Sequence, residues 1–198
     1  MSKASDVSSY VARQVGILQL DTNARAANLA KLRRGVGKTL EESPETWSMV
    51  LSGMPEGLLS KSADCRATEG EKAAYTALTL FALHQQGESR PVNSPGASFG
   101  NAIRSLVTPE NEEGIKRRFD AVVTSTTIEE LSYHARGLVQ LMRASDRLIA
   151  MDYPRFAKDL YNFQFPDGRR NVILSWGQDY YRIASKNDND NGDKKESE

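Results

Sequence analysis

Apolar residues recur along most of this chain every three or four positions, the interval that places side chains on one face of a helix. In residues 43–55, for example, Trp47, Val50, Leu51 and Met54 follow this spacing. The stretch "NVILSW" (residues 171–176) has the composition of a strand, but no partner strand is evident, so a helix is predicted there too. The predicted helices lie in residues 6–20, 23–34, 43–55, 71–86, 99–107, 108–123, 128–147, 152–161 and 171–183.

Residues typical of helix N-termini precede several of these segments. Thr68 with Glu71 and Thr127 with Glu130 have the spacing of a capping box, in which each side chain bonds the other residue's backbone N–H. Both motifs fall directly before or within strongly apolar helical patterns, which fixes where those helices should begin. The other predicted N-terminal positions are Ser43, Thr108 and Asp152.

A long segment rich in Gly, Pro and Ser, "GESRPVNSPGAS" (residues 87–98), interrupts the helical pattern near the middle of the chain. Connections of this length and composition are typical of boundaries between packed units. We therefore predict an all-α protein of two small helical bundles packed together, formed by residues 1–87 and 98–185. The segment that follows, "KNDNDNGDKKESE" (residues 186–198), has no apolar side chain and is predicted to be a disordered acidic and polar tail.

The amino-acid composition excludes several classes of protein. The 198 residues carry 26 basic and 26 acidic side chains, and this zero net charge argues against a generic basic coat for nucleic acids. The longest apolar run, "AAYTALTLFAL", is too short to cross a bilayer, and no signal peptide is expected. The single cysteine, Cys65, excludes an internal disulfide. These features predict a cytoplasmic protein without a membrane anchor.

The stretch "GVGKT" (residues 35–39) resembles the end of a nucleotide-binding P-loop. A P-loop needs a glycine five positions before its second glycine, and that position is Leu32 here. It also needs a preceding strand, whereas the residues before Leu32 are rich in Ala and Leu and predict a helix. Gly35 is therefore interpreted as the glycine that ends this helix. The nearby cations can then belong to a solvated helix end, a partner contact or a site for nucleic-acid phosphates.

Basic residues form local clusters in spite of the balanced total. One cluster lies in residues 21–38, where Asp21 is the sole acid. A second lies on the predicted helix after Thr127, where Arg136, Arg143 and Arg147 share the face opposite the apolar one. An exposed helix face usually mixes charge signs because pairs of opposite charge four residues apart stabilise it. A stripe of arginines without acids is therefore a candidate phosphate-binding surface, although a solvated face remains the alternative.

Two further arginine pairs are less distinctive. Arg117 and Arg118 directly precede Phe119, so Arg118 is either a binding residue or a structural ion-pair partner. Arg169 and Arg170 follow "PDG", which reads as a turn, and turns often carry charge. Neither pair alone predicts a function.

Residues suited to catalysis are sparse. His84 and His134 lie on or beside apolar faces and are interpreted as core histidines, and with Cys65 they do not give the spacing of a zinc site. No paired carboxylates suggest a metal-dependent nuclease, so no metal, cofactor or enzymatic activity is expected. The aromatic residues at helical core spacing are likewise predicted to be buried rather than available for base stacking: Trp47, Phe81, Phe119, Phe156 and Trp176.

Six short motifs, in this order, resemble the CasB family, the small subunit of the type I-E CRISPR Cascade complex. They are "KLRRG", "ALTLFALHQQ", "KRRFDAVV", "HARGLVQLMR", "MDYPRFAKDL" and "WGQDYY". The resemblance spans roughly residues 10–183 and implies a non-catalytic, all-helical subunit. It also implies assembly with a second copy and with the other Cascade subunits, and binding of guide RNA and of the target and displaced DNA strands of the R-loop. The residues to which it assigns nucleic-acid binding are Arg33, Arg34, Arg117, Arg118, Arg136 and Arg143, with Lys38, Arg147, Arg169 and Arg170 as weaker candidates.

Two other functions remain open at this point. The chain can be a purely structural helical adaptor whose arginines bind acidic protein partners. It can also be a hydrolase or nucleotide-binding enzyme, against which Leu32 and the scarcity of catalytic residues both argue.

The P-loop alternative gives a first prediction. Because Leu32 replaces the required glycine, Lys38 should not hold a nucleoside triphosphate, and calorimetry should detect no saturable ATP binding with or without magnesium. A micromolar dissociation constant that is lost in Lys38→Ala would contradict this prediction.

Overall fold

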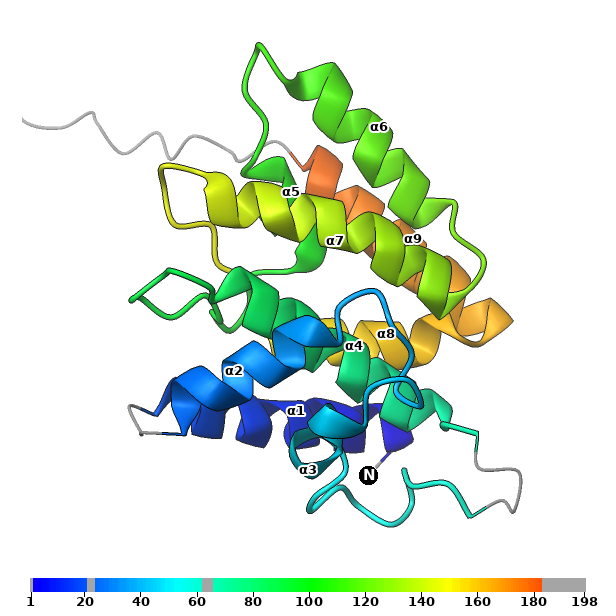
Figure 1. Cartoon of the computed structure of the whole chain (residues 1–198). Coiled ribbons are helices and arrows are strands. Elements are labelled where there is room, and N and C mark those ends of the chain that lie inside the picture. The colour runs from blue at the N-terminus through cyan, green and yellow to red at the C-terminus, as the bar shows by residue number, and fades with distance from the viewer. Residues whose placement is uncertain (1, 21–23, 62–65, 183–198) are drawn as a thin grey trace, which may run out of the picture.

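The computed structural model describes residues 2–20, 24–61 and 66–182, and in this part of the chain helices are the only regular elements (Figure 1). Outside the helices, an isolated bridge joins Asn93 to Met151. The all-α prediction is therefore confirmed. The elements are α1 (Lys3–Gln19), α2 (Arg25–Arg34), a 3-10 turn η1 (Pro44–Thr46), α3 (Trp47–Val50), α4 (Glu69–His84), α5 (Phe99–Arg104), α6 (Glu112–Val123), α7 (Ile128–Ala144), α8 (Tyr153–Phe163) and α9 (Pro166–Tyr181).

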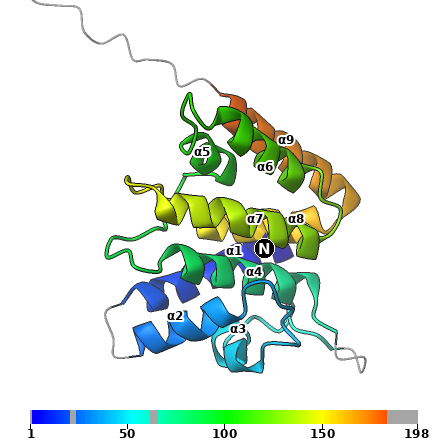
Figure 2. The ribbon, with the colours of Figure 1, turned by 45° about the horizontal axis from the view of Figure 1, so that its top comes forward.

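Helix α4 lies at the centre of the molecule. Every residue from Ala73 to His84 is buried, so the helix must be covered on all sides. Helices α1, α2, α7 and α8 all pack against it. In both views α7 lies between α4 and α6, while α2 lies on the opposite side of α4 (Figures 1 and 2).

Helix α8 is the element that joins the two halves of the chain. It follows α7 in the sequence, yet it packs most extensively against α1 and also against α4. The buried side chains form one cluster that includes Val11 of α1, Leu80 of α4 and Phe156 of α8. The division into bundles of residues 1–87 and 98–185 stays a prediction, and any such bundles share a common core through α8.

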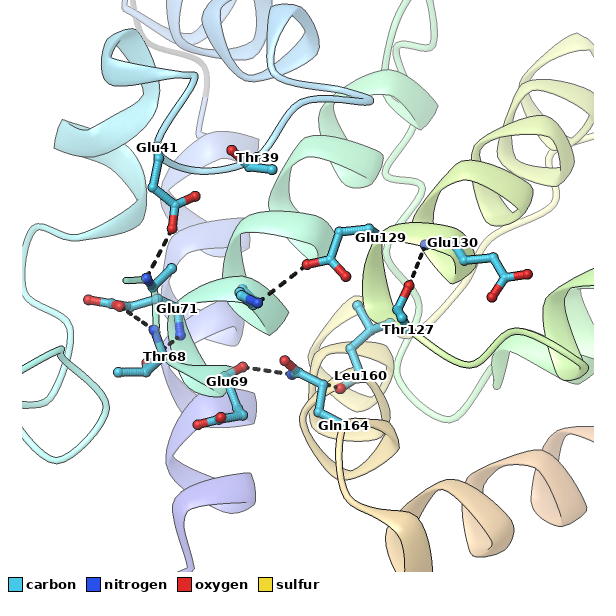
Figure 3. Close-up of polar contacts among 12 residues, drawn as sticks. Thr39, Glu41, Thr68, Glu69, Glu71, Thr127, Glu129, Glu130, Leu160 and Gln164 are labelled. Atoms are coloured by element: carbon cyan, nitrogen blue, oxygen red, sulfur yellow. Dashed lines mark hydrogen bonds and ion pairs between the residues drawn. The ribbon is translucent and has the colours of Figure 1, made fainter. Parts of the chain in front are cut away.

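Most of the hydrogen bonds predicted at the helix N-termini are present. At the start of α4, Thr68 Oγ1 accepts from the Glu71 N–H at 3.1 Å and the Glu71 carboxylate accepts from the Thr68 N–H at 2.7 Å, which completes the box (Figure 3). At the start of α7, Thr127 Oγ1 accepts from the Glu130 N–H at 3.1 Å, as expected. The Glu130 carboxylate, however, accepts from the N–H of Thr126 at 2.8 Å rather than from that of Thr127. Asp152 caps α8 as predicted.

Several predicted boundaries differ from the structure. Ser43 lies at the N-cap position of η1 and Pro44 begins it, as predicted, but Ser43 makes no capping hydrogen bond and only η1 and the short α3 follow. Its buried hydroxyl lies 2.8 Å from the Tyr75 hydroxyl instead. Helix α6 begins after Asn111 instead of Thr108. The "PDG" segment is the first turn of α9, because Pro166 at the first helical position and Asp167 beside the positive end of the helix dipole both favour a helix start.

Two of the predicted core residues are not in the core. Phe81, Phe119, Phe156 and Trp176 are buried as expected, but the Trp47 side chain is 44% exposed. Its indole N–H donates to the Leu40 carbonyl at 2.8 Å, so the polar edge is satisfied while part of the ring faces solvent. His84 is buried as predicted, whereas His134 is only partly buried and is no core histidine.

Some predictions fall on residues outside the described part of the chain. They concern Cys65, the last turn up to Ile183 and the tail of residues 186–198. Among the helices that are described, none is long and apolar enough to cross a membrane.

His84 is an ionisable group at the buried C-terminal end of α4. Its Nδ1 lies 3.0 Å from the Tyr153 hydroxyl, and the two rings are 6.0 Å apart. Burial lowers the pKa of His84 to about 4 from an ordinary value of 6.5, because a charged imidazole is poorly solvated there.

This lowered pKa predicts acid-sensitive stability. Between pH 6.5 and about 4 the unfolded chain binds a proton at this site that the folded chain does not. The contribution of His84 to stability should therefore fall as pH falls through this window, by on the order of 3 kcal/mol in total. Urea unfolding at several pH values measures it. His84→Gln should flatten the dependence on pH, whereas the matched His134→Gln variant should keep most of it; equal slopes in all three proteins would contradict the prediction.

Candidate nucleic-acid interface

The end of α2 is held in place by a close contact with α4. The buried Tyr75 hydroxyl donates to the Gly35 carbonyl oxygen at 2.6 Å, and a Cβ atom on Gly35 would lie only 2.6 Å from that hydroxyl. Glycine is therefore required for this approach. Leu32 lies one turn earlier and is completely buried, so the segment is a helix end anchored in the core and not a phosphate loop.

The basic residues of this helix end face different surroundings. Arg34 and Lys38 are exposed, whereas Arg33 is partly buried and lines a hollow of about 300 Å³ beside the end of α4. Gly37 has a φ of 86°, the left-handed conformation that turns the chain back toward α7. A Cβ on Gly37 would lie 3.2 Å from the Nη1 atom of Arg136. The helix end and the arginine stripe of α7, far apart in the sequence, therefore meet.

Arginines of α6 and α7 line a common hollow of about 480 Å³, here called the arginine hollow. Arg117 and Arg118 come from α6, and Arg136 comes from α7. All three side chains are exposed, and none of the described residues that line the hollow is acidic. The complete lining is Arg117, Arg118, Ala121, Tyr133, His134, Arg136, Gly137 and Gln140.

The sequence predicted that Arg136, Arg143 and Arg147 share the exposed face of one helix, and this is correct for the first two. Arg136 and Arg143 lie on the exposed face, and an Arg143 guanidinium N–H donates to the side-chain oxygen of Gln86 at 2.6 Å. The placement of Arg147 on this helix was wrong, because α7 ends at Ala144. Arg147 lies in the following loop, where its guanidinium donates to the Ser105 carbonyl oxygen.

Arg169 and Arg170 have structural contacts in α9. The Arg169 guanidinium lies 5.0 Å from the centre of the Phe163 ring, and its Nε donates to the Phe163 carbonyl at 3.2 Å. Arg170 forms an exposed ion pair with Asp167, one turn earlier. Neither residue lines the arginine hollow. The structure thus separates this pair from the other predicted binding residues.

The remaining candidate cations are not neutralised by described acidic side chains. Within the described ranges, ion pairs involve cations such as Lys72, Arg104 and Lys116, each matched to a carboxylate. No such pair there includes Arg33, Arg34, Lys38, Arg117, Arg118, Arg136, Arg143 or Arg147. Guanidinium groups without acidic partners can donate charge-assisted hydrogen bonds to a phosphate.

Tyr133 is a residue of this surface that the sequence analysis missed. Its side chain is 71% exposed and contributes to the lining of the arginine hollow. It stands three positions before Arg136 and seven before Gln140, so its place on the exposed face of α7 could have been read from helical spacing. The sequence analysis considers only aromatic residues at core spacing, and Tyr133 is not one of them.

The protein-family profile of the CRISPR-associated protein Cse2 matches residues 28–181. The chain belongs to the Cse2 family. The resemblance to CasB that the sequence motifs indicated is thereby confirmed. No curated protein matches the chain by sequence.

Solved structures of CasB share the fold of this Cse2 family member. CasB from Thermobifida fusca is 28% identical, with a TM-score of 0.73 over 92% of this chain and 99% of that chain. CasB from Thermus thermophilus is 22% identical, with a TM-score of 0.64 over 91% and 99% of the two chains. A chain of a CRISPR RNA-guided surveillance complex is 19% identical, with a TM-score of 0.65 over 91% and 94%. The last two likenesses show the fold alone.

The contrast between Arg169 and Arg170 gives a testable prediction. Arg169→Ala should lower the free energy of unfolding by about 1 kcal/mol, because it removes both the contact with the Phe163 ring and a hydrogen bond. Arg170→Ala is the matched control and should change stability by less than about 0.5 kcal/mol, since its ion pair is exposed. Urea unfolding compares the two variants, and equal losses would show that the Arg169 contacts contribute nothing.

Proposed function

We propose that the chain is a non-catalytic small subunit of a cytoplasmic, guide-RNA-directed CRISPR surveillance complex of the type I-E Cascade class. In this proposal its basic residues bind nucleic-acid backbone and stabilise the R-loop, which contains the guide RNA with the target strand and the displaced strand. The observation that carries the proposal is the arginine hollow, where Arg117, Arg118 and Arg136 converge from two helices without an acidic neighbour in the lining. Membership of the Cse2 family supports it independently.

The chemistry of the hollow suits phosphates better than bases. Arginine presents a planar fork of N–H donors that fits phosphate oxygens, and contacts to phosphates carry no sequence information. In guide-directed recognition the base pairs read the sequence, and exchanging a DNA duplex for an RNA–DNA duplex is nearly balanced in free energy. A few backbone contacts can therefore decide whether the opened state persists. This role needs no reaction to be catalysed.

The proposed partners are the other Cascade subunits, a second copy of this chain, the guide RNA and both DNA strands. The family match and the fold shared with a chain of a CRISPR RNA-guided surveillance complex support assembly of this kind. Within the described residues, no group of three His, Cys, Asp or Glu side chains could hold a metal ion, and no metal or cofactor is assigned.

A structural adaptor is the second candidate function. Exposed apolar side chains on α1 and α9, such as Ile17, Leu174 and Tyr181, are suited to contacts with protein partners. In this alternative the arginines bind acidic protein surfaces, and their loss should disturb assembly instead of DNA binding.

The double variant Arg136→Ala with Arg143→Ala distinguishes the two functions. Both side chains are exposed, so the variant should fold normally and join the complex. If both arginines contact phosphates, target DNA binding at physiological salt should weaken similarly for unrelated target sequences. The plot of log affinity against log salt should also flatten by roughly 0.7–0.9 for each lost contact. The measurement is DNA affinity of the assembled complex at several salt concentrations.

A matched control removes two cations that already have acidic partners. In Arg104→Ala with Lys116→Ala, the lost charges are those paired with Glu112 and Asp120. This control should keep the salt slope of the wild type. An unchanged slope in the Arg136 and Arg143 variant would remove the stripe from the interface, and failure of that variant to assemble would favour the adaptor.

A further inference from the structure

Tyr133 stands between two hollows. Among the large apolar and aromatic side chains described as exposed, it has the greatest exposed fraction, 71%. It contributes to the arginine hollow on one side and to a second hollow of about 340 Å³ on the other. Because the Tyr133 ring is so exposed, it contributes little to packing of the core. The ring is therefore available to contact a ligand in either hollow.

The second hollow, here called the tyrosine hollow, lies where the loop of residues 37–41 faces the first turns of α4 and α7 (Figure 3). Its inner surface includes the buried side chains of Leu40, Tyr75 and Ile128. Its volume is at the lower end of the range for small-molecule sites. A hollow of this volume is about the size of a single nucleotide. A mainly apolar floor of this size suits a flat aromatic group.

Among the described charged groups around the tyrosine hollow, two cations form no ion pair with a described acid. Lys72 is held by Glu129 at 3.3 Å (Figure 3). The Glu41 carboxylate accepts the Ala67 N–H at 3.0 Å, and this bond holds its pKa below the usual value. Lys38 and Arg66, which also line the hollow, form no ion pair with a described acid. A negatively charged ligand can therefore reach Lys38 on one side of Tyr133 and Arg136 on the other.

We propose that Tyr133 is a stacking platform for an unpaired base, which occupies the tyrosine hollow while the adjoining phosphates contact the arginine hollow. Proteins that bind single strands combine such a cationic track with aromatic rings, and stacking tolerates any base because every base has a π-face. A base in a duplex is stacked on its neighbours and cannot enter. The His134 ring, whose centre is 5.3 Å from that of Tyr133 at an interplanar angle of 76°, packs edge-on against the tyrosine and supports its orientation.

This inference rests on the proposed function, since the arginine hollow must bind phosphates for a base to be presented to Tyr133. It adds a preference that phosphate contacts alone cannot give: a strand with bases should bind more tightly than the same backbone without them. It also extends the nucleic-acid surface from the arginine hollow toward Lys38.

The test uses the purified full-length chain and fluorescence anisotropy with three labelled probes of equal length. They are a single-stranded oligothymidine, an oligonucleotide of abasic sites with the same phosphates, and a duplex. The wild type should bind oligothymidine about tenfold more tightly than the abasic probe, in line with the effect of one stacked base. Tyr133→Ala should lose this difference and bind the abasic probe as the wild type does, with the salt slope unchanged. Tyr133→Phe should retain the wild-type preference.

The matched control is Tyr181→Ala, which removes another exposed tyrosine, 59% exposed, that lines neither hollow. It should bind all three probes as the wild type does. Equal wild-type affinity for oligothymidine and the abasic probe would overturn the stacking inference while leaving phosphate binding in place. Salt-dependent binding of none of the probes, or tighter binding of a poly-glutamate peptide than of oligothymidine, would overturn both the inference and the proposed function and favour the adaptor.

Discussion

The burial of α4 is the constraint on which the rest of the structure depends. A helix without an exposed face from Ala73 to His84 can exist only if other helices cover it completely, and each polar group on it must find a partner inside the protein. The Tyr75 hydroxyl donates to the Gly35 carbonyl at 2.6 Å, and the His84 ring meets the Tyr153 hydroxyl at 3.0 Å. The first contact fixes the end of α2 and the second fixes the start of α8. The hydrogen bonds that these buried polar groups need thus position elements from both halves of the chain.

The same constraint places the candidate interface. Helix α7 covers α4 with one apolar face, which includes the buried Ala135, Leu138 and Met142. Because a helix has a fixed periodicity, burying that face determines that Tyr133 and Arg136 point away from the core. The contact between Tyr75 and Gly35 then holds the turn at Gly37 against Arg136. The cations therefore lie on rigid, anchored elements, and binding a phosphate there requires little further ordering of the protein.

How much the sequence could predict depends on the range of the interaction. Local rules were sufficient for the capping box of Thr68 and Glu71 and for the exposed face of α7, since both depend on residues within one or two turns. The start of α9 was misread because Asp167 and Gly168 are common in turns, although Pro166 before them also favours a helix start. The arginine hollow could not be foreseen from spacing, because Arg118 and Arg136 are brought together only by the packing of α6 on α7.

The distribution of charge matters more for the proposed role than its total. With 26 basic and 26 acidic side chains, the chain as a whole has no net attraction for a polyanion. Some of the described acids, however, pair with other cations: Asp120 pairs with Lys116, and Glu112 pairs with Arg104. The cations of the arginine hollow have no such partners among the described residues. In the proposed role, this surface attracts phosphates only at short range, within about a Debye length.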